Sequence, residues 1–119
     1  MSKQSSEFQN PYEEKCSIVY AMSLIGAKWK IPILWHLAHY NILHYNELKR
    51  HLTGITNTVL TRCLRELESD NIVLRKSDGT VPPSVTYELT DMGKELIPAL
   101  DGLYTWGTIT NPTLFNFFY

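Results

Sequence analysis

The chain of 119 residues lacks several features that would assign it to other protein classes. It has two cysteines, Cys16 and Cys63, which are too few for a disulfide framework, so we expect reduced thiols. No apolar run approaches the roughly 18 to 20 residues that a membrane span requires. Residues 1–9 are polar and lack the apolar centre of a signal peptide. These absences predict a cytoplasmic protein with no membrane partner.

Patterns typical of catalysis and of metal binding are also missing. The sequence has no Ser/His/Asp arrangement, glycine-rich phosphate loop or paired carboxylates, so we expect neither an enzyme nor a cofactor. His36 and His39 are spaced to share one face of a helix, but no further clustered ligands accompany them. We therefore interpret the histidines as solvated or half-buried side chains, and we expect no metal site.

The net charge is only −1, but the charges are unevenly distributed. Residues 28–76 include eight basic and four acidic side chains, so this segment carries +4 and the remainder −5. The local field decides whether a phosphate backbone is attracted, so the segment is a candidate for nucleic-acid contact despite the overall balance. A hydrophobic content of 44% argues against disorder, and the length is typical of one domain.

Residues 54–67 are the most informative segment, because they read as a tight turn followed by an amphipathic helix. Leu60, Leu64 and Leu67 fall on one stripe of that helix. Val59 and Cys63 border the stripe. The opposite face carries hydroxyls and guanidinium groups, from Thr58, Thr61, Arg62 and Arg65. Short hydroxyl side chains let a DNA backbone come close, and guanidinium groups form paired hydrogen bonds with phosphates and guanine edges. This face is therefore typical of a DNA recognition helix.

The order of the predicted elements is that of a winged helix-turn-helix. We expect a helix from Ser17, as N-cap, to a stop at Gly26, a second helix from residue 30 or 31 to 40, and a loop at 41–44. A short helix from residue 45 or 46 to 52, a turn, and a helix from 56 to about 70 follow, with Thr56 as the N-cap. Strands at 72–76 and 85–89 form the wing.

A helix that begins at Thr90 completes the chain, and Pro98 kinks it or splits it in two. The fold class is therefore mainly α with a small β-hairpin. The expected organisation is a flexible arm at 1–12, a DNA-binding and dimerisation domain at 13–107, and a hydrophobic tail at 108–119.

Residues 16–106 resemble the HxlR-type winged helix-turn-helix transcriptional regulators of bacteria and archaea. A Gly-x-Lys-Trp segment, a Val-Pro-Pro wing and a Tyr-x-Leu-Thr-x-x-Gly junction, in that order and spacing, make the signal specific. The residues that carry it are Cys16, residues 24–30, Ile33, Leu34, Glu47, Leu48, Gly54, Ile55, Leu60, Thr61, residues 64–67, Val81, Pro82, Pro83, Val85, residues 87–90, Gly93, Leu96, Pro98, Leu100, Trp106 and Gly107.

The resemblance implies a homodimer on double-stranded operator DNA with inverted half-sites, joined through the N-terminal and C-terminal helices. Relatives often have a basic residue at the position of Thr58 and an arginine at that of Ser84, so the base-reading code does not transfer. The predicted DNA contacts are Thr56, Asn57, Thr58, Thr61, Arg62, Arg65, Lys49, Arg50, Lys76, Ser84, Lys28 and Lys30. The alternative for the arginines and lysines is a solvated surface.

Cys16 matches a family position near the start of the first helix, where some relatives carry a thiol switch. A helix N-terminus and the adjacent Lys15 favour the reactive thiolate, so Cys16 is the redox candidate and a thiol-reactive compound the candidate effector. The alternative is an ordinary small residue at a dimer interface. For Cys63 we favour packing. A competing function for the whole chain is a winged-helix protein-interaction module that does not bind DNA.

Overall fold

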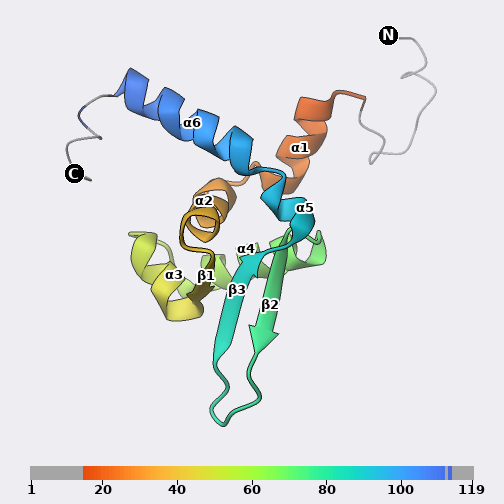
Figure 1. Ribbon diagram of the computed structural model, residues 1–119, viewed down its shortest axis with the longest axis vertical. Helices are drawn as coiled ribbons and strands as arrows, with labels where there is room; N and C mark the ends of the chain where they lie inside the picture. The colour runs from red at the N-terminus through yellow and green to blue at the C-terminus, as the bar shows by residue number, and fades with distance from the viewer. Residues whose placement is uncertain (1–14, 112, 114–119) are drawn as a thin grey trace.

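The computed structural model describes residues 15–111 and residue 113. The expected arm at 1–12 and most of the expected tail at 108–119 lie outside the described residues. Figure 1 shows the arrangement. The elements are α1 (Ser17–Ile25), α2 (Lys30–Tyr40), β1 (Ile42–His44), α3 (Tyr45–His51), α4 (Asn57–Ser69), β2 (Val73–Ser77), β3 (Val85–Leu89), α5 (Asp91–Lys94) and α6 (Ile97–Thr110).

The predicted winged helix-turn-helix is confirmed, with two local differences. Residues 42–44 form the strand β1 instead of a loop, because they pair with β3. Cys16, and not Ser17, is the N-cap of α1. The C-terminal segment is split into α5 and α6, which confirms one of the two predicted alternatives, and Pro98 lies in the first turn of α6, where proline is tolerated.

The three strands form an antiparallel sheet in the order β1-β3-β2. In the β2–β3 hairpin Val73 is opposite Leu89 and Ser77 is opposite Val85. On the other edge of β3, Leu43 is opposite Tyr87. The hairpin extends beyond the helices as the wing, at the bottom of Figure 1. Because β1 leads directly into α3, the sheet joins the wing to the helix-turn-helix.

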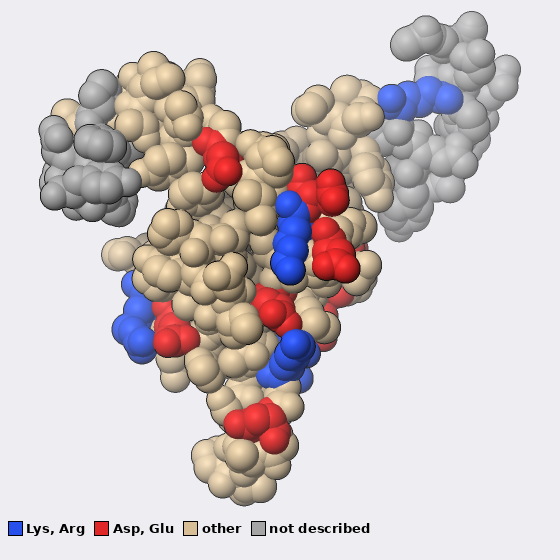
Figure 2. Space-filling model, in the orientation of Figure 1, with Lys and Arg blue, Asp and Glu red and all other residues tan. Residues whose placement is uncertain are grey.

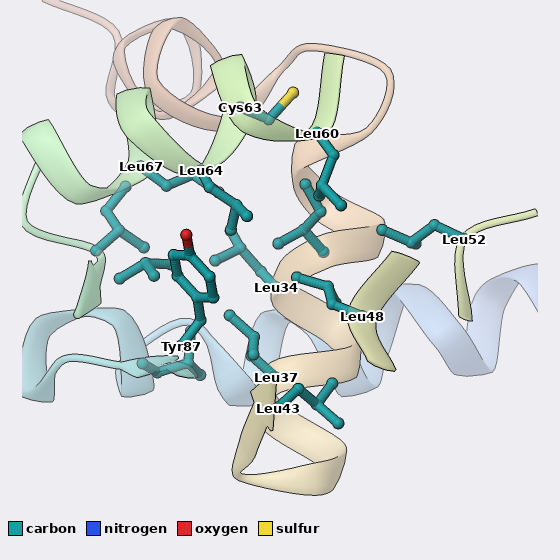
Figure 3. Close-up of a cluster of buried hydrophobic side chains, with 14 of the residues drawn as sticks. Leu34, Leu37, Leu43, Leu48, Leu52, Leu60, Cys63, Leu64, Leu67 and Tyr87 are labelled. Atoms are coloured by element: carbon teal, nitrogen blue, oxygen red, sulfur yellow. The ribbon is translucent and has the colours of Figure 1, made fainter. Parts of the chain in front are cut away.

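The hydrophobic core lies between α2, α3, α4 and the sheet (Figure 3). Leu34 and Leu37 of α2 and Leu48 of α3 face the leucine stripe of α4, and Tyr87 of β3 closes the cluster. The predicted stripe is confirmed, since Leu60, Leu64 and Leu67 are all buried. One face of α4 is thereby committed to the core, so its opposite face is left for solvent or a ligand.

Helices α1 and α6 project from this core, as the upper part of Figure 1 shows. Ile25 is the buried residue of α1 and Leu100 that of α6. Stacking of Trp35 on Tyr104, with ring centroids 4.8 Å apart, also holds α6 to α2. The remaining apolar side chains on both helices are largely exposed, at Ile18, Val19, Tyr20, Met22, Leu103, Trp106 and Ile109.

No single helix in the described part of the chain is long and apolar enough to cross a membrane. Helices α1 and α2 satisfy a length and composition criterion only when taken together, and their axes are bent by 83°. Since α2 carries core leucines, its apolar character has an explanation within the fold.

Candidate nucleic-acid interface

The turn between α3 and α4 is set by Gly54 and Thr56. Gly54 has φ +94°, a conformation that side chains disfavour, so glycine is required for this tight turn. The Thr56 hydroxyl accepts a hydrogen bond from the backbone N–H of Val59 at 3.2 Å, which confirms its predicted role as N-cap. The first turn of α4 therefore begins at a fixed point, with its remaining backbone N–H groups directed outward.

The polar face of α4 is accessible. Asn57, Thr58, Arg62 and Arg65 are exposed and Thr61 is half-buried. Together with Glu66 these side chains line a shallow depression along the helix. Within the described residues neither Arg62 nor Arg65 forms an ion pair, so their hydrogen-bond donors are available to an anion.

Tyr45 lies at the site but is not among the residues that the sequence predicts there. Its hydroxyl lies 3.0 Å from the Thr61 hydroxyl, and it donates to the backbone carbonyl of Asn57 at 3.2 Å. Tyr45 is the first residue of α3, so it connects the bracing helix to the first two turns of α4. Nothing in the local sequence predicts this contact, because it depends on how α3 and α4 are packed.

We expect Tyr45→Phe to lower the free energy of unfolding by about 1 kcal/mol, the usual net contribution of one hydrogen bond. Amides at the start of α4 should also exchange faster with deuterium, because the tie to Asn57 is lost. Urea unfolding and amide exchange measure both effects. Tyr40→Phe is the matched control, since the described structure gives the Tyr40 hydroxyl no hydrogen bond. Equal effects in both variants would contradict the positioning role of Tyr45.

The bracing helix α3 places Arg50 on the surface and leaves Lys49 half-buried. The carboxylate of Glu47 accepts a hydrogen bond from the backbone N–H of His44 at 2.7 Å. This bond, followed by the one from the His44 ring, lowers the pKa of Glu47. The Glu47 carboxylate is therefore held by His44 at the N-terminus of α3, and Arg50 remains as an exposed cation of this helix.

The wing has a different chemistry from α4. Lys76 is exposed and forms an ion pair with Glu88 of the neighbouring strand, with 2.7 Å between Nζ and Oε2. The Asp78 carboxylate accepts hydrogen bonds from the Ser84 backbone N–H at 3.0 Å and from the Thr80 hydroxyl at 2.7 Å. The bonds from Thr80, followed by that from Ser84, lower the pKa of Asp78. Ser84 thus contributes its backbone to the shape of the wing.

The tip of the wing carries no basic residue between Ser77 and Val85. Figure 2 shows no blue side chain at the tip, which is at the bottom of the view. Val81 is 97% exposed there. A wing contact with DNA would therefore involve apolar and backbone groups at the tip, with the cations nearer its base.

The two lysines predicted near the start of α2 lie in different environments. Lys28 is exposed, with its Nζ 5.1 Å from the centroid of the Trp29 ring. Trp29 is half-buried against the core, in line with its expected packing role. Lys30 is only 7% exposed, and its Nζ lies 2.8 Å from the Glu66 carboxylate. The structure therefore places Lys30 inside the fold and not among the exposed cations.

The two thiols also differ. Cys16 is exposed at the N-terminus of α1, where its carbonyl accepts the first intrahelical bond, from Tyr20. Cys63 is buried on α4 at the edge of the core (Figure 3). Burial raises the pKa of the Cys63 thiol, which opposes formation of its thiolate. Packing, the role favoured for Cys63, agrees with these observations.

The histidines of α2 and α3 are arranged in aromatic stacks. His36 lies 5.1 Å from His51 between ring centroids, and Tyr40 stacks on His51 at 4.6 Å. Burial lowers the pKa of His36, and a hydrogen bond to the Pro32 carbonyl opposes this effect without cancelling it. Among the described residues no group of three side chains has the arrangement that would hold a metal ion.

The sequence and the fold match known proteins over most of the chain. Residues 24–113 match the HxlR-like helix-turn-helix family model. MalR of Fusobacterium mortiferum, named as a regulatory protein, is 46% identical over 101 residues, which are 85% of this chain and 93% of MalR. The redox regulator HypR in its reduced form is 35% identical with a TM-score of 0.77, and the match covers 85% of this chain and 99% of HypR. Diamide-treated YodB of B. subtilis is 26% identical with a TM-score of 0.63, covering 80% of this chain and 93% of YodB.

Proposed function

Because the chain belongs to the HxlR-like helix-turn-helix family, we propose that it binds double-stranded operator DNA with inverted half-sites as a homodimer. It is a DNA-binding transcriptional regulator with a winged helix-turn-helix and not an enzyme, in agreement with its relatives. The observation that carries the proposal is the exposed polar face of α4, where Arg62 and Arg65, which form no ion pair within the described residues, lie beside hydroxyl and amide groups. Such a face suits base edges and phosphates in a major groove.

In the proposed complex α4 enters the major groove. Thr61 and Arg62 read base edges, and Arg65 lies nearer the phosphate backbone. Thr56, Asn57 and Thr58 approach the DNA at the N-terminus of α4, where backbone N–H groups favour a phosphate. Lys28, Lys49, Arg50 and Lys76 provide further phosphate contacts, and Ser84 contributes through the wing.

Helices α1 and α6 are the proposed homodimer surface. Their exposed apolar side chains are too numerous to be scattered surface residues, since α1 alone presents Ile18 at 71% and Val19 at 51% exposure. Residues 17–25 carry no charge, and Asp101 is the acid of α6. Figure 2 accordingly shows tan over nearly all of both helices in this view. A second copy of the chain would bury these faces by two-fold symmetry.

The proposal is tested by selecting duplexes from a random library with the full chain, followed by footprinting and titration over a range of salt. An inverted repeat whose affinity falls steeply with salt is expected, because phosphate contacts release counterions. The selection would return no common sequence, and binding would be weak at all salt concentrations, if the chain were a protein-interaction module.

A second candidate function is redox control through Cys16. Its exposure at the start of α1 supports this function, as does similarity to HypR, described as a redox regulator, and to YodB, solved after diamide treatment. Diamide takes two electrons and two protons from two thiols and forms a disulfide. Since Cys63 is buried, we propose that the second thiol is Cys16 of the other protomer or a small cellular thiol.

We expect diamide to change the operator affinity of the wild type by about tenfold or more, a typical coupling between two sites. Cys16→Ser should abolish the response, because it removes the exposed thiol at the dimerisation helix. Cys63→Ala is the matched control and should retain it. The measurement is a titration with and without diamide, with a non-reducing gel to identify the disulfide. An unchanged response in Cys16→Ser would remove Cys16 from the mechanism.

A further inference from the structure

Lys30 is the buried charged residue in the described part of the chain. An ammonium group loses its hydration when it is buried, and this costs free energy unless other groups replace the water. Its Nζ lies 2.8 Å from Oε1 of Glu66 and 3.4 Å from the backbone oxygen of Leu24. Glu66 is half-exposed, and the hydrogen bond from Lys30 is the first cause of its lowered pKa.

These partners belong to different parts of the fold. Leu24 is near the end of α1, Lys30 is the first residue of α2, and Glu66 lies on α4. One side chain therefore connects the helix with the exposed apolar face to the helix with the exposed polar face. No other ion pair within the described residues joins α1 or its junction to α4.

The other contacts at the junction between α1 and α2 are mainly apolar, since Leu24 and Trp29 are partly buried against the core. The chain bends by 83° there, and Ile25 is the buried side chain of α1. At Gly26 an added Cβ would collide with the Met22 carbonyl, so the bend is tight. Apolar contacts of Ile25 permit small rotations, because hydrophobic burial has no preferred direction. The Lys30 ammonium group is joined to α4 by the Glu66 ion pair and to α1 by its hydrogen bond to the Leu24 carbonyl, and hydrogen bonds have a preferred direction.

We propose that Lys30 is a positioning residue that sets the angle between α1 and α4, and thereby the separation of the two recognition helices in the homodimer. This inference rests on the proposed function. Half-site centres must match the helical repeat of DNA, so small changes in this angle matter. A tilt of about 10° moves a point about 20 Å away by roughly 3.5 Å, which is close to the rise of one base pair.

The test measures the separation of α4 between protomers with nitroxide spin labels and pulsed dipolar spectroscopy. The label is attached at Ser69→Cys, an exposed position at the end of α4, in the full chain carrying Cys16→Ser. Cys63 is 2% exposed and should not be labelled. Lys30→Met and Glu66→Gln should shift or broaden the distance distribution by about 3 Å or more, the rise of one base pair.

Glu68→Gln is the matched control, because it makes the same charge change on the exposed surface of α4 without touching Lys30. Its distance distribution should equal that of the parent. A double variant of Lys30→Met and Glu66→Gln should behave like either single variant, since both remove one interaction. Thermal unfolding of each variant separates a change of angle from loss of the fold.

A second measurement uses selected operators whose half-sites are moved apart or together by one base pair. The wild type and Glu68→Gln should prefer one spacing by about tenfold or more, and Lys30→Met should reduce this to within about threefold. Identical distance distributions and spacing preferences in all variants would overturn the role of Lys30. Absence of any inter-spin signal in the parent would instead remove the homodimer, and this inference with it.

Discussion

Arg62→Ala is expected to cost the operator complex about 2 to 6 kcal/mol of sequence discrimination. A well-placed arginine–base contact is worth roughly 1 to 3 kcal/mol, and a homodimer presents it twice. Arg62 is exposed on the polar face of α4 and has no ion-pair partner within the described residues, so its loss leaves the fold intact. The measurement is the affinity of both proteins for the selected operator and for duplexes altered at single positions.

The matched control is Arg75→Ala, which removes the same charge from an exposed position of β2 outside the proposed contact surface. This variant should lose little affinity and keep its sequence preference. If Arg62→Ala retains the sequence preference of the wild type, Arg62 does not read bases. An unchanged preference with a reduced salt slope would assign Arg62 to phosphate, because each phosphate contact contributes about one to the slope.

The second large effect is expected from Ile18→Asp, which should convert the homodimer to a monomer. Ile18 is 71% exposed in the isolated chain, so the substitution should not disturb the core. In the homodimer each aspartate would be buried in an apolar surface, at a cost of several kcal/mol per charge. Operator affinity should fall by about 100-fold or more, because the two recognition helices would no longer bind as one unit.

Sedimentation velocity gives the oligomeric state and a titration gives the affinity. Val81→Asp serves as the control, because Val81 is 97% exposed at the tip of the wing, far from α1 in Figure 1. It should sediment as the wild type does. If Ile18→Asp also remains a dimer, α1 is not part of the interface and the contact surface must be sought elsewhere.

The recognition helix was predictable because its determinants are local. Gly54, Thr56 and the spacing of three leucines act within a few residues of one another, and the structure confirms each of them. The identity of the bases is not predictable in this way. It depends on where the side chains of Thr58 and Arg62 lie against a partner.

The features that the sequence did not reveal depend on distant residues. β1 has three residues and exists through its pairing with β3, so its own sequence reads as a loop. The hydroxyl of Tyr45 meets α4 only after the helix-turn-helix has formed. The sequence predicts Lys30 as a DNA-contacting cation at a helix N-terminus, but its side chain is buried. Its partner Glu66 lies on another helix, and only the packing of α2 against α4 brings them together.

The pairing of β1 with β3 has a mechanical consequence for DNA binding. Leu43 is opposite Tyr87, so the strand that enters α3 is fixed to a strand of the wing. This pairing restricts movement of the wing relative to the helix-turn-helix. In the proposed complex, binding of α4 would place the wing at a high effective concentration near the neighbouring phosphates, so the wing would need little further ordering to bind. Each protomer would then hold DNA through two coupled contacts, and it would dissociate only when α4 and the wing leave together.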